Sequence, residues 1–237
     1  MRVMIPPGRA ASDMEEQSTL IVYYDKKGKI KTKLRRSIFI VRLNWVDVFS
    51  LFGLTSALCS IWNSVRGDFC YALGFMFGAM FFDAFDGVFA RRFGTEREFG
   101  RYLDGFIDAF DYLIAPAIFL FFWGFNEPLY LTVMVVYVTC GIIRLSVFNQ
   151  TGNIRTGNRL SYLGMPTFWS HFILAIFYGL SLVVGPKGMI KLFLALTLLA
   201  YSFLMILNRP FYKPRSKALM IFIVGSMVLL FFVAGSR

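Results

Sequence analysis

Four aspartates lie in two segments that are otherwise apolar enough to cross a membrane: Asp83, Asp86, Asp104 and Asp108. One charged residue near the centre of a membrane-spanning helix costs about 2.5–3.5 kcal/mol on insertion scales. Four carboxylates therefore require a counter-charge. Oxygen-rich clusters suit hard cations, so the pattern predicts a site for Mg²⁺, Mn²⁺ or Ca²⁺. Two such ions would neutralise four carboxylates and could bridge the oxygens of a diphosphate.

The spacing predicts that these carboxylates face one another across a helical hairpin. Asp83 and Asp86 are three residues apart and share a helix face. Asp104, Asp108 and Asp111 recur at intervals of four and three residues, which again selects one face. Between the two segments, a glycine that can end a helix is followed by a capping-box pattern over residues 95–98.

The composition predicts an all-α integral membrane protein. Of the 237 residues, 57% are hydrophobic and only 16% are charged, which lies on the apolar side of a soluble domain. Several apolar runs approach or exceed the roughly 20 residues that span a bilayer. Seven spans are predicted, at about residues 46–65, 69–92, 100–124, 128–149, 166–184, 188–208 and 217–236.

Basic residues predict the orientation of this multi-pass protein. With a cytosolic N-terminus, ten basic residues of the connecting segments lie inside and four lie outside. The positive-inside rule therefore places the N-terminus and the aspartate site on the cytosolic side. The formal charge of +11 is accounted for by topology and acidic lipid headgroups, so no nucleic-acid partner is expected.

Residues 1–43 are predicted to form a cytosolic tail and residues 44–237 the transmembrane domain. Over Lys31–Leu43, Leu34, Ile38 and Val41 share a helical face amid basic residues, the pattern of an interfacial amphipathic helix. A solvated basic linker is the alternative. The preceding Ile21–Tyr24 has the composition of one strand of a small hairpin, which we do not include in the predicted fold.

Small residues beside the aspartates predict a nucleotide. Gly87, Ala90 and Gly100 leave backbone exposed where a flat base and a ribose could approach closely. Arg91 can reach a phosphate with its fork of donors. The alternative for the three small residues is close packing between helices.

Eight residues form the pattern Asp83-x2-Asp86-Gly87-x2-Ala90-Arg91-x8-Gly100-x3-Asp104-x3-Asp108. It resembles, without a mismatch, the signature of the CDP-alcohol phosphatidyltransferase family. The resemblance implies a six-helix transmembrane core, here with a seventh helix, and a homodimer in the membrane. It also implies two divalent cations and a CDP-linked lipid donor, either CDP-diacylglycerol or CDP-archaeol.

The resemblance also implies roles for single residues. Asp83, Asp86 and Asp104 look like metal ligands, and Asp108 looks like a ligand that is also the general base. The nucleotide and diphosphate contacts would come from Asp86, Gly87, Ala90, Arg91, Gly100 and Ser50. The alcohol would attack the lipid-linked phosphorus directly and CMP would leave, without a phospho-enzyme.

A second segment bears on the acceptor alcohol. Residues 140–149, CGIIRLSVFN, and the turn Gly164-Met165-Pro166 resemble a segment of bacterial and archaeal phosphatidylserine synthases, although Val147 replaces an arginine of that pattern. Arg144 lies inside an apolar span, where it must pair or bind a ligand. Either an acceptor carboxylate or the donor diphosphate would suit it. The resemblance of this longer segment favours serine as the acceptor.

Other residues leave the acceptor open. Arg209 and Lys213 could attract the same anions, or could serve topology alone. Where serine synthases continue with a small hydroxyl residue and Phe-Gly, this chain has Asp111-Tyr112-Leu113. A carboxylate at Asp111, near the acceptor, would favour a cationic or hydroxyl-rich alcohol. Choline, ethanolamine and an inositol derivative therefore remain alternatives.

Two other classes use membrane or diphosphate-binding aspartates. A divalent metal transporter would line facing helices with them, but would not require the glycines, alanine and arginine at these spacings. A prenyl-diphosphate transferase carries its aspartate motifs far apart in sequence rather than on one hairpin. The single histidine, His171, is predicted to be packed or interfacial rather than a metal ligand.

Overall fold

In the computed structural model the chain divides into two compact units, Met1–Asn44 and Trp45–Arg237. The structure describes residues 19–24, 30–35, 43–93, 98–152, 154–156, 159–184, 187–212 and 217–236. The turn and capping box predicted at 94–97, and most of the predicted N-terminal tail, lie outside these ranges.

The first unit contains an antiparallel hairpin. Strand β1 (Thr19–Tyr24) pairs with β2 (Ile30–Arg35), and Thr19 lies opposite Arg35. The helix predicted from residue 31 is therefore wrong as far as Arg35. The segment IKTKLR alternates apolar or β-branched residues with basic ones, which is a strand period as well as a partial helix face. The remaining residues of that predicted helix, up to 42, lie outside the described part.

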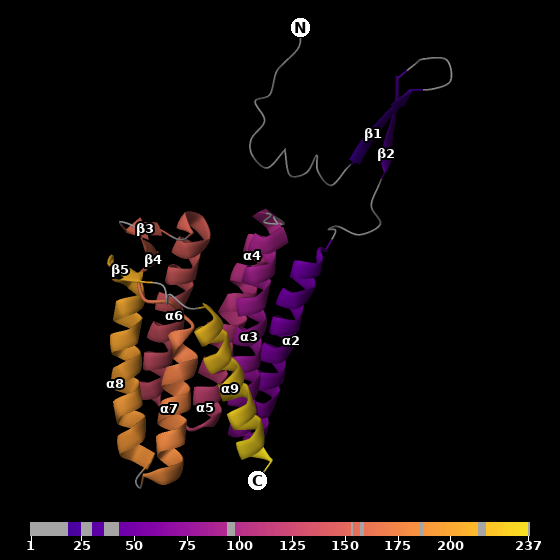
Figure 1. The fold of residues 1–237 in the computed structure, drawn as a ribbon. Helices are drawn as coiled ribbons and strands as arrows, with labels where there is room; N and C mark the ends of the chain where they lie inside the picture. Colours follow the sequence, from indigo (N-terminus) through magenta and orange to yellow (C-terminus); the bar gives the residue numbers. More distant parts are fainter. Residues whose placement is uncertain are drawn as a thin grey trace. The chain divides into compact units, whose positions relative to one another are not determined.

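The second unit is a helix bundle with a small sheet (Figure 1). Its helical segments are α2 (Trp45–Arg66), α3 (Phe69–Phe93), α4 (Glu98–Ala109), η1 (Phe110–Ile114), α5 (Ala115–Phe122), α6 (Pro128–Thr151), α7 (Trp169–Val183), α8 (Lys187–Ile206) and α9 (Lys217–Gly235). Each predicted span coincides with one of these helices or with the continuous α4–η1–α5 segment. The prediction of an all-α membrane protein is confirmed.

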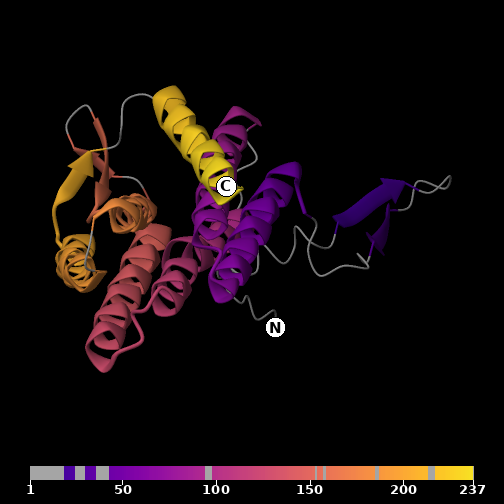
Figure 2. The same ribbon diagram turned by 90° about the horizontal axis from the view of Figure 1, so that it is seen from below.

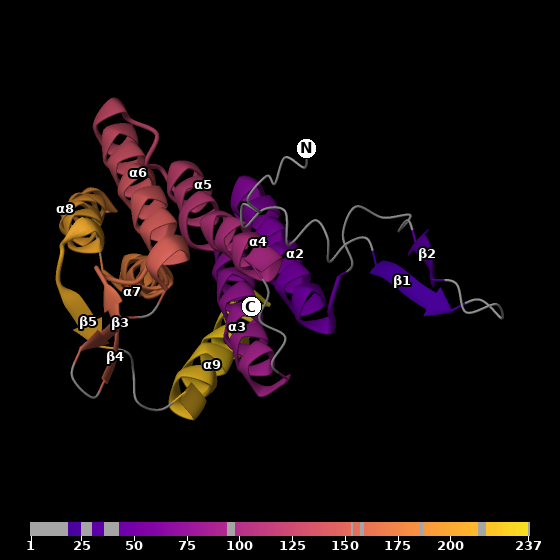
Figure 3. The same cartoon turned by 90° about the horizontal axis from the view of Figure 1, so that it is seen from above.

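Among the described residues, four helices are long and apolar enough to cross a membrane: Trp45–Arg66, Phe99–Phe122, Pro128–Thr151 and Gly188–Ile206. Three further apolar helices are shorter over their described parts. The count of seven spans stays a prediction. Seen from below, α9 lies beside α3, and seen from above, α6 lies beside α8 (Figures 2 and 3).

The closest helix pair, α2 and α3, packs through small residues. Gly53, Ser56 and Ala57 lie on the face of α2 that meets α3, and the Ser56 hydroxyl donates to the Phe75 carbonyl at 2.7 Å. A Cβ added at Gly78 would lie 2.8 Å from the Ser56 Oγ. Small side chains let two helix backbones approach in a membrane, where hydrophobic burial does not drive association. This contact fixes α3, which carries Asp83.

A three-stranded sheet caps one end of the bundle. Strands β3 (Ile154–Thr156), β4 (Arg159–Leu163) and β5 (Pro210–Tyr212) are antiparallel and lie in this order, at the end where α6 and α8 terminate (Figure 1). Gly164 follows β4 with φ +74°, and its amide donates to the Arg209 carbonyl at 3.0 Å. This sheet was not predicted from the sequence.

The α4–η1–α5 segment changes helical register before Pro116. Pro116 has no N–H, and its ring clashes with the carbonyl four residues earlier, which is that of Tyr112. The wider π-helical turn, in which the Ala115 amide bonds the Phe110 carbonyl, accommodates that clash. The Tyr112 carbonyl consequently needs a donor from another helix.

A substitution of Gly141, on α6, tests how tightly this helix packs against the π-helical turn. A Cβ added there would press on the side chain of Leu113, which is fully buried in the π-helical turn. We expect Gly141→Ala to lower the free energy of unfolding by about 1–3 kcal/mol, as overpacking does in rigid cores. Thermal unfolding of the purified chain in detergent measures this.

The matched control is Gly179→Ala on α7, where an added Cβ meets nothing within 4 Å. Alanine is the better helix former, so this variant should be unchanged or slightly more stable. Equal losses in both variants would contradict the packing of α6 against the π-helical turn.

Candidate functional site

Three of the predicted aspartates meet in the structure. One carboxylate oxygen each from Asp83, on α3, and from Asp104 and Asp108, on α4, lie within 4.8 Å of one another. All three side chains are partly buried. Carboxylates this close repel one another unless a cation or a proton is shared between them. An all-oxygen donor set fits Mg²⁺, Mn²⁺ or Ca²⁺, so these residues suit the predicted divalent ions.

The remaining motif residues of α3 can be placed by backbone only. Asp86, Gly87, Ala90 and Arg91 lie in the last turns of α3, and their side chains lie outside the described part of the chain. Their predicted contacts with a metal and a nucleotide therefore stay predictions.

Gly100 lies where α4 approaches α2. A Cβ added at Gly100 would lie 3.5 Å from Oδ1 of Asp47, which is an ordinary van der Waals distance. Helix packing in this structure therefore does not require glycine at this position. Ser50 lies one turn beyond Asp47, is buried, and donates its hydroxyl to the Val46 carbonyl at 3.3 Å.

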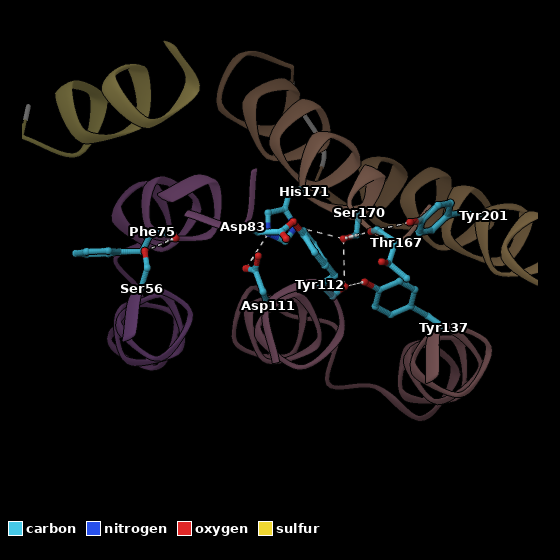
Figure 4. A network of polar contacts seen from close by, with 10 residues as sticks. All are labelled: Ser56, Phe75, Asp83, Asp111, Tyr112, Tyr137, Thr167, Ser170, His171 and Tyr201. Carbon is cyan, nitrogen blue, oxygen red and sulfur yellow. Dashed lines mark hydrogen bonds and ion pairs between the residues drawn. The ribbon is translucent and has the colours of Figure 1, made fainter. Parts of the chain in front are cut away.

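A tyrosine that was not among the predicted site residues reaches the cluster. The Tyr112 hydroxyl donates to Oδ2 of Asp83 at 2.6 Å (Figure 4). Tyr112 is 3% exposed, and it comes from the π-helical turn next to Pro116. Its position four residues before a proline is the one sequence signal that could have marked it.

The Tyr112 carbonyl, to which Pro116 cannot donate, accepts hydrogen bonds from two side chains. The hydroxyl of Tyr137, on α6, and the hydroxyl of Ser170, on α7, both point to it (Figure 4). At the start of α7, the Tyr201 hydroxyl of α8 donates to the Thr167 carbonyl at 2.8 Å. One carbonyl thus links the π-helical turn to α6 and α7.

His171 is packed, as predicted, and it forms a buried pair with Asp111. His171 Nε2 lies 3.0 Å from Oδ1 of Asp111, with side-chain exposures of 0% and 3%. Because this carboxylate already has a cationic or hydrogen-bonding partner, it no longer argues for a cationic acceptor alcohol. Ser170 Oγ lies 3.2 Å from His171 Nδ1, and its buried hydroxyl also contacts backbone carbonyls.

Arg144 is buried between aromatic rings. Its side chain is 5% exposed, and its Cζ lies 4.9 Å from the ring centre of Phe148 and 5.7 Å from that of Tyr162. The strand β4 of the capping sheet supplies Tyr162. Within the described residues Nε of Arg144 has no hydrogen-bond partner. Asp108 is close enough to act on Arg144 electrostatically.

Of the two remaining acceptor candidates, only Arg209 lies in the described part of the chain, at the capping sheet. Arg209 is exposed and immediately precedes β5. Lys213 lies outside the described residues. The contact of either residue with an acceptor stays a prediction.

The sequence of this chain is similar to that of a known protein family. The sequence model of the CDP-alcohol phosphatidyltransferase family matches residues 43–233. Archaetidylserine synthase of Methanothermobacter thermautotrophicus is 31% identical over 136 residues, which are 56% of this chain and 56% of that protein.

Two further relatives carry one name. CDP-diacylglycerol–serine O-phosphatidyltransferase of Bacillus subtilis is 30% identical over 149 residues, 61% of this chain and 77% of that protein. The enzyme of the same name from Methanocaldococcus jannaschii is 32% identical over 88 residues, 37% of this chain and 40% of that protein. The match thus spans about half the length of the archaetidylserine synthase and less of the M. jannaschii protein.

The buried pair gives a stability prediction. His171→Leu leaves the Asp111 carboxylate buried without its partner, which should cost about 3–5 kcal/mol of unfolding free energy. The double variant Asp111→Val with His171→Leu removes both groups and should recover most of that loss. Unfolding of the purified chain in detergent with added SDS measures both. A single variant as stable as the wild type would show that the pair is not stabilising.

Proposed function

The chain belongs to the CDP-alcohol phosphatidyltransferase family, and we propose that it transfers a phosphatidyl or archaetidyl group from a CDP-linked lipid to a small alcohol. CMP is the product released, and L-serine is the proposed acceptor. The observation that carries the proposal is the meeting of Asp83, Asp104 and Asp108, with one oxygen each within 4.8 Å, inside the family motif.

The acidic cluster would hold the metal ions of this reaction. Asp83, Asp104 and Asp108 offer clustered oxygens, and Asp86 would complete the set from the same helix as Asp83. Two Mg²⁺ or Mn²⁺ ions, when bound, supply positive charge to the diphosphate oxygens and to the departing CMP.

Asp108 is the proposed general base. An alcohol is a poor nucleophile until a positioned base takes its proton, and a carboxylate at the edge of the cluster suits this task. The hydroxyl oxygen then forms its bond to the lipid-linked phosphorus while the bond to CMP breaks. Transfer is direct, so isolation of a phospholipid covalently attached to an aspartate would contradict the mechanism.

The donor's nucleotide would lie along the turns of α3 and α4 that carry the motif glycines. Gly100 supports this placement. Helix packing leaves van der Waals room for a Cβ at this position, so the close approach of a ligand would explain why the residue is a glycine. Gly87, Ala90 and Ser50 would form the rest of the surface, and Arg91 would bind the diphosphate.

The charges near Asp108 favour an acceptor that carries a carboxylate. Arg144 is a buried cation with an unpaired Nε among the described residues, within electrostatic range of Asp108. The nearby acidic residue, Asp111, is compensated by His171. The balance therefore favours serine over choline or ethanolamine, and the relatives named above are serine enzymes by name. Arg209 and Lys213 would attract the same anions.

The proposed setting is a homodimer with its N-terminus and active site on the cytosolic side of the membrane. The excess of basic residues in the segments assigned to that side supports the orientation. Residues 1–43 would form a tail outside the transferase domain of residues 44–237.

A panel of acceptors tests the function. The purified chain, with Mn²⁺ or Mg²⁺ and CDP-diacylglycerol or CDP-archaeol, should release CMP with serine and not with choline, ethanolamine, inositol or glycerol phosphate. In the control, Asp108→Asn should lower turnover at least about 100-fold, as loss of a general base does, while donor binding persists. CMP release with another alcohol would reassign the acceptor. A divalent-ion flux in liposomes without CMP release would favour a transporter.

Arg144 gives a prediction about specificity. If its guanidinium binds the serine carboxylate, Arg144→Gln loses a charged hydrogen bond worth about 1.5–3 kcal/mol. The KM for serine should then rise about 10- to 150-fold, with a much smaller change in the KM for the CDP-lipid. Arg66→Gln is the control, because Arg66 is an exposed arginine at the far end of α2. Equal effects on both substrates would contradict the acceptor assignment.

A further inference from the structure

The hydrogen bond from Tyr112 to Asp83 has no part in the chemistry described above. We propose that Tyr112 is a positioning residue, whose hydroxyl holds the Asp83 carboxylate in the orientation that binds a divalent cation. This inference rests on the proposed function, since it assigns Asp83 to a metal site.

The bond has the geometry of a strong interaction. At 2.6 Å, the Tyr112 hydroxyl and Oδ2 of Asp83 are within the short range typical of a neutral O–H donor and a carboxylate. A carboxylate has about four lone-pair sites, so accepting this bond leaves Asp83 with acceptor capacity for a cation. The donor therefore orients the group without replacing the metal.

Tyr112 can orient a ligand because its own position is fixed. Its carbonyl accepts hydrogen bonds from Tyr137 and Ser170, which belong to two different helices. Its ring packs against His171, with 5.0 Å between ring centres, and it is 3% exposed. Backbone and ring are thus both held, and the phenol cannot turn away from Asp83 without breaking this packing.

The expected effect is on metal affinity. Removing a group that hydrogen-bonds to a metal ligand typically lowers metal affinity or activity about 10- to 100-fold. A mobile Asp83 would have to be ordered on each binding event, beside two other carboxylates that repel it. Phenylalanine at position 112 keeps the ring and its packing but removes the donor.

The test is a Mn²⁺ titration of the full chain in detergent micelles, followed by electron paramagnetic resonance. Tyr112→Phe should raise the Kd for Mn²⁺ about 10-fold or more. The matched control is Tyr178→Phe on α7, since Tyr178 is buried and its hydroxyl lies 3.6 Å from Cys70 Sγ, not at the cluster. The control should stay within about twofold of the wild type. A similar Kd for Tyr112→Phe and the wild type would overturn the proposal.

Thermal unfolding separates positioning from stability. Without metal, Tyr112→Phe and Tyr178→Phe should lose similar stability, because each lacks one buried hydroxyl. Added Mn²⁺ should raise the Tm of Tyr112→Phe less than that of the control, because ligand stabilisation falls as Kd rises. Equal metal-induced shifts would contradict the role, as a purely structural tyrosine would produce them.

A second variant weakens the hydrogen bonds that hold the backbone of Tyr112. Tyr137→Phe removes one of the two donors to the Tyr112 carbonyl and should raise the Mn²⁺ Kd by a smaller factor. Mn²⁺ binding that Asp104→Asn leaves intact would also overturn the proposal. A wild type that binds Mn²⁺ at the cluster but releases no CMP with any alcohol overturns the proposed transfer instead.

Discussion

Three carboxylates that repel one another lie at the centre of the candidate site, and the surrounding helices must hold them together. Asp83, Asp104 and Asp108 offer oxygens within 4.8 Å of one another in a chain whose other helical residues are mostly apolar. Such a group is tolerated when cations or protons offset the repulsion and the helices are held together. The close small-residue contact between α2 and α3 provides part of that rigidity. The hydroxyl of Tyr112 donates a hydrogen bond to Asp83 in this cluster.

A missing hydrogen-bond donor organises the region behind the cluster. Because Pro116 lacks an amide hydrogen, the Tyr112 carbonyl depends on side chains from α6 and α7. The same register change turns Asp111 toward His171 of α7. The π-helical turn of the α4–η1–α5 segment is therefore hydrogen-bonded to α6 and α7, and the groups that meet there are all buried. Defects of this kind, which recur at functional sites, would be costly if the freed carbonyl stayed unpaired.

What could be predicted from the sequence follows from how local each signal is. The helical segments and the facing of Asp83 toward Asp104 and Asp108 depend on spacing within one hairpin, and the structure has them where they were predicted. The segment from Lys31 to Arg35 was wrongly predicted as helix, because its period-two pattern also fits a basic helix face. The sheet β3–β4–β5 was missed, since its strands are three to five residues long and β5 pairs with β4 across α7 and α8.

The acceptor side was harder to predict for the same reason. The donor motif is contained in 26 consecutive residues, counted from Asp83 to Asp108. The groups around Arg144 come from α6, from β4 and, through electrostatics, from Asp108 on α4. Asp111 is an example. Its spacing alone predicts a further carboxylate of the cluster, but in the folded chain it pairs with His171, which lies 60 residues later in the sequence. Tertiary contacts thus decide which charged groups keep an open hydrogen-bonding position, and among the described residues Nε of Arg144 is a buried donor without a partner.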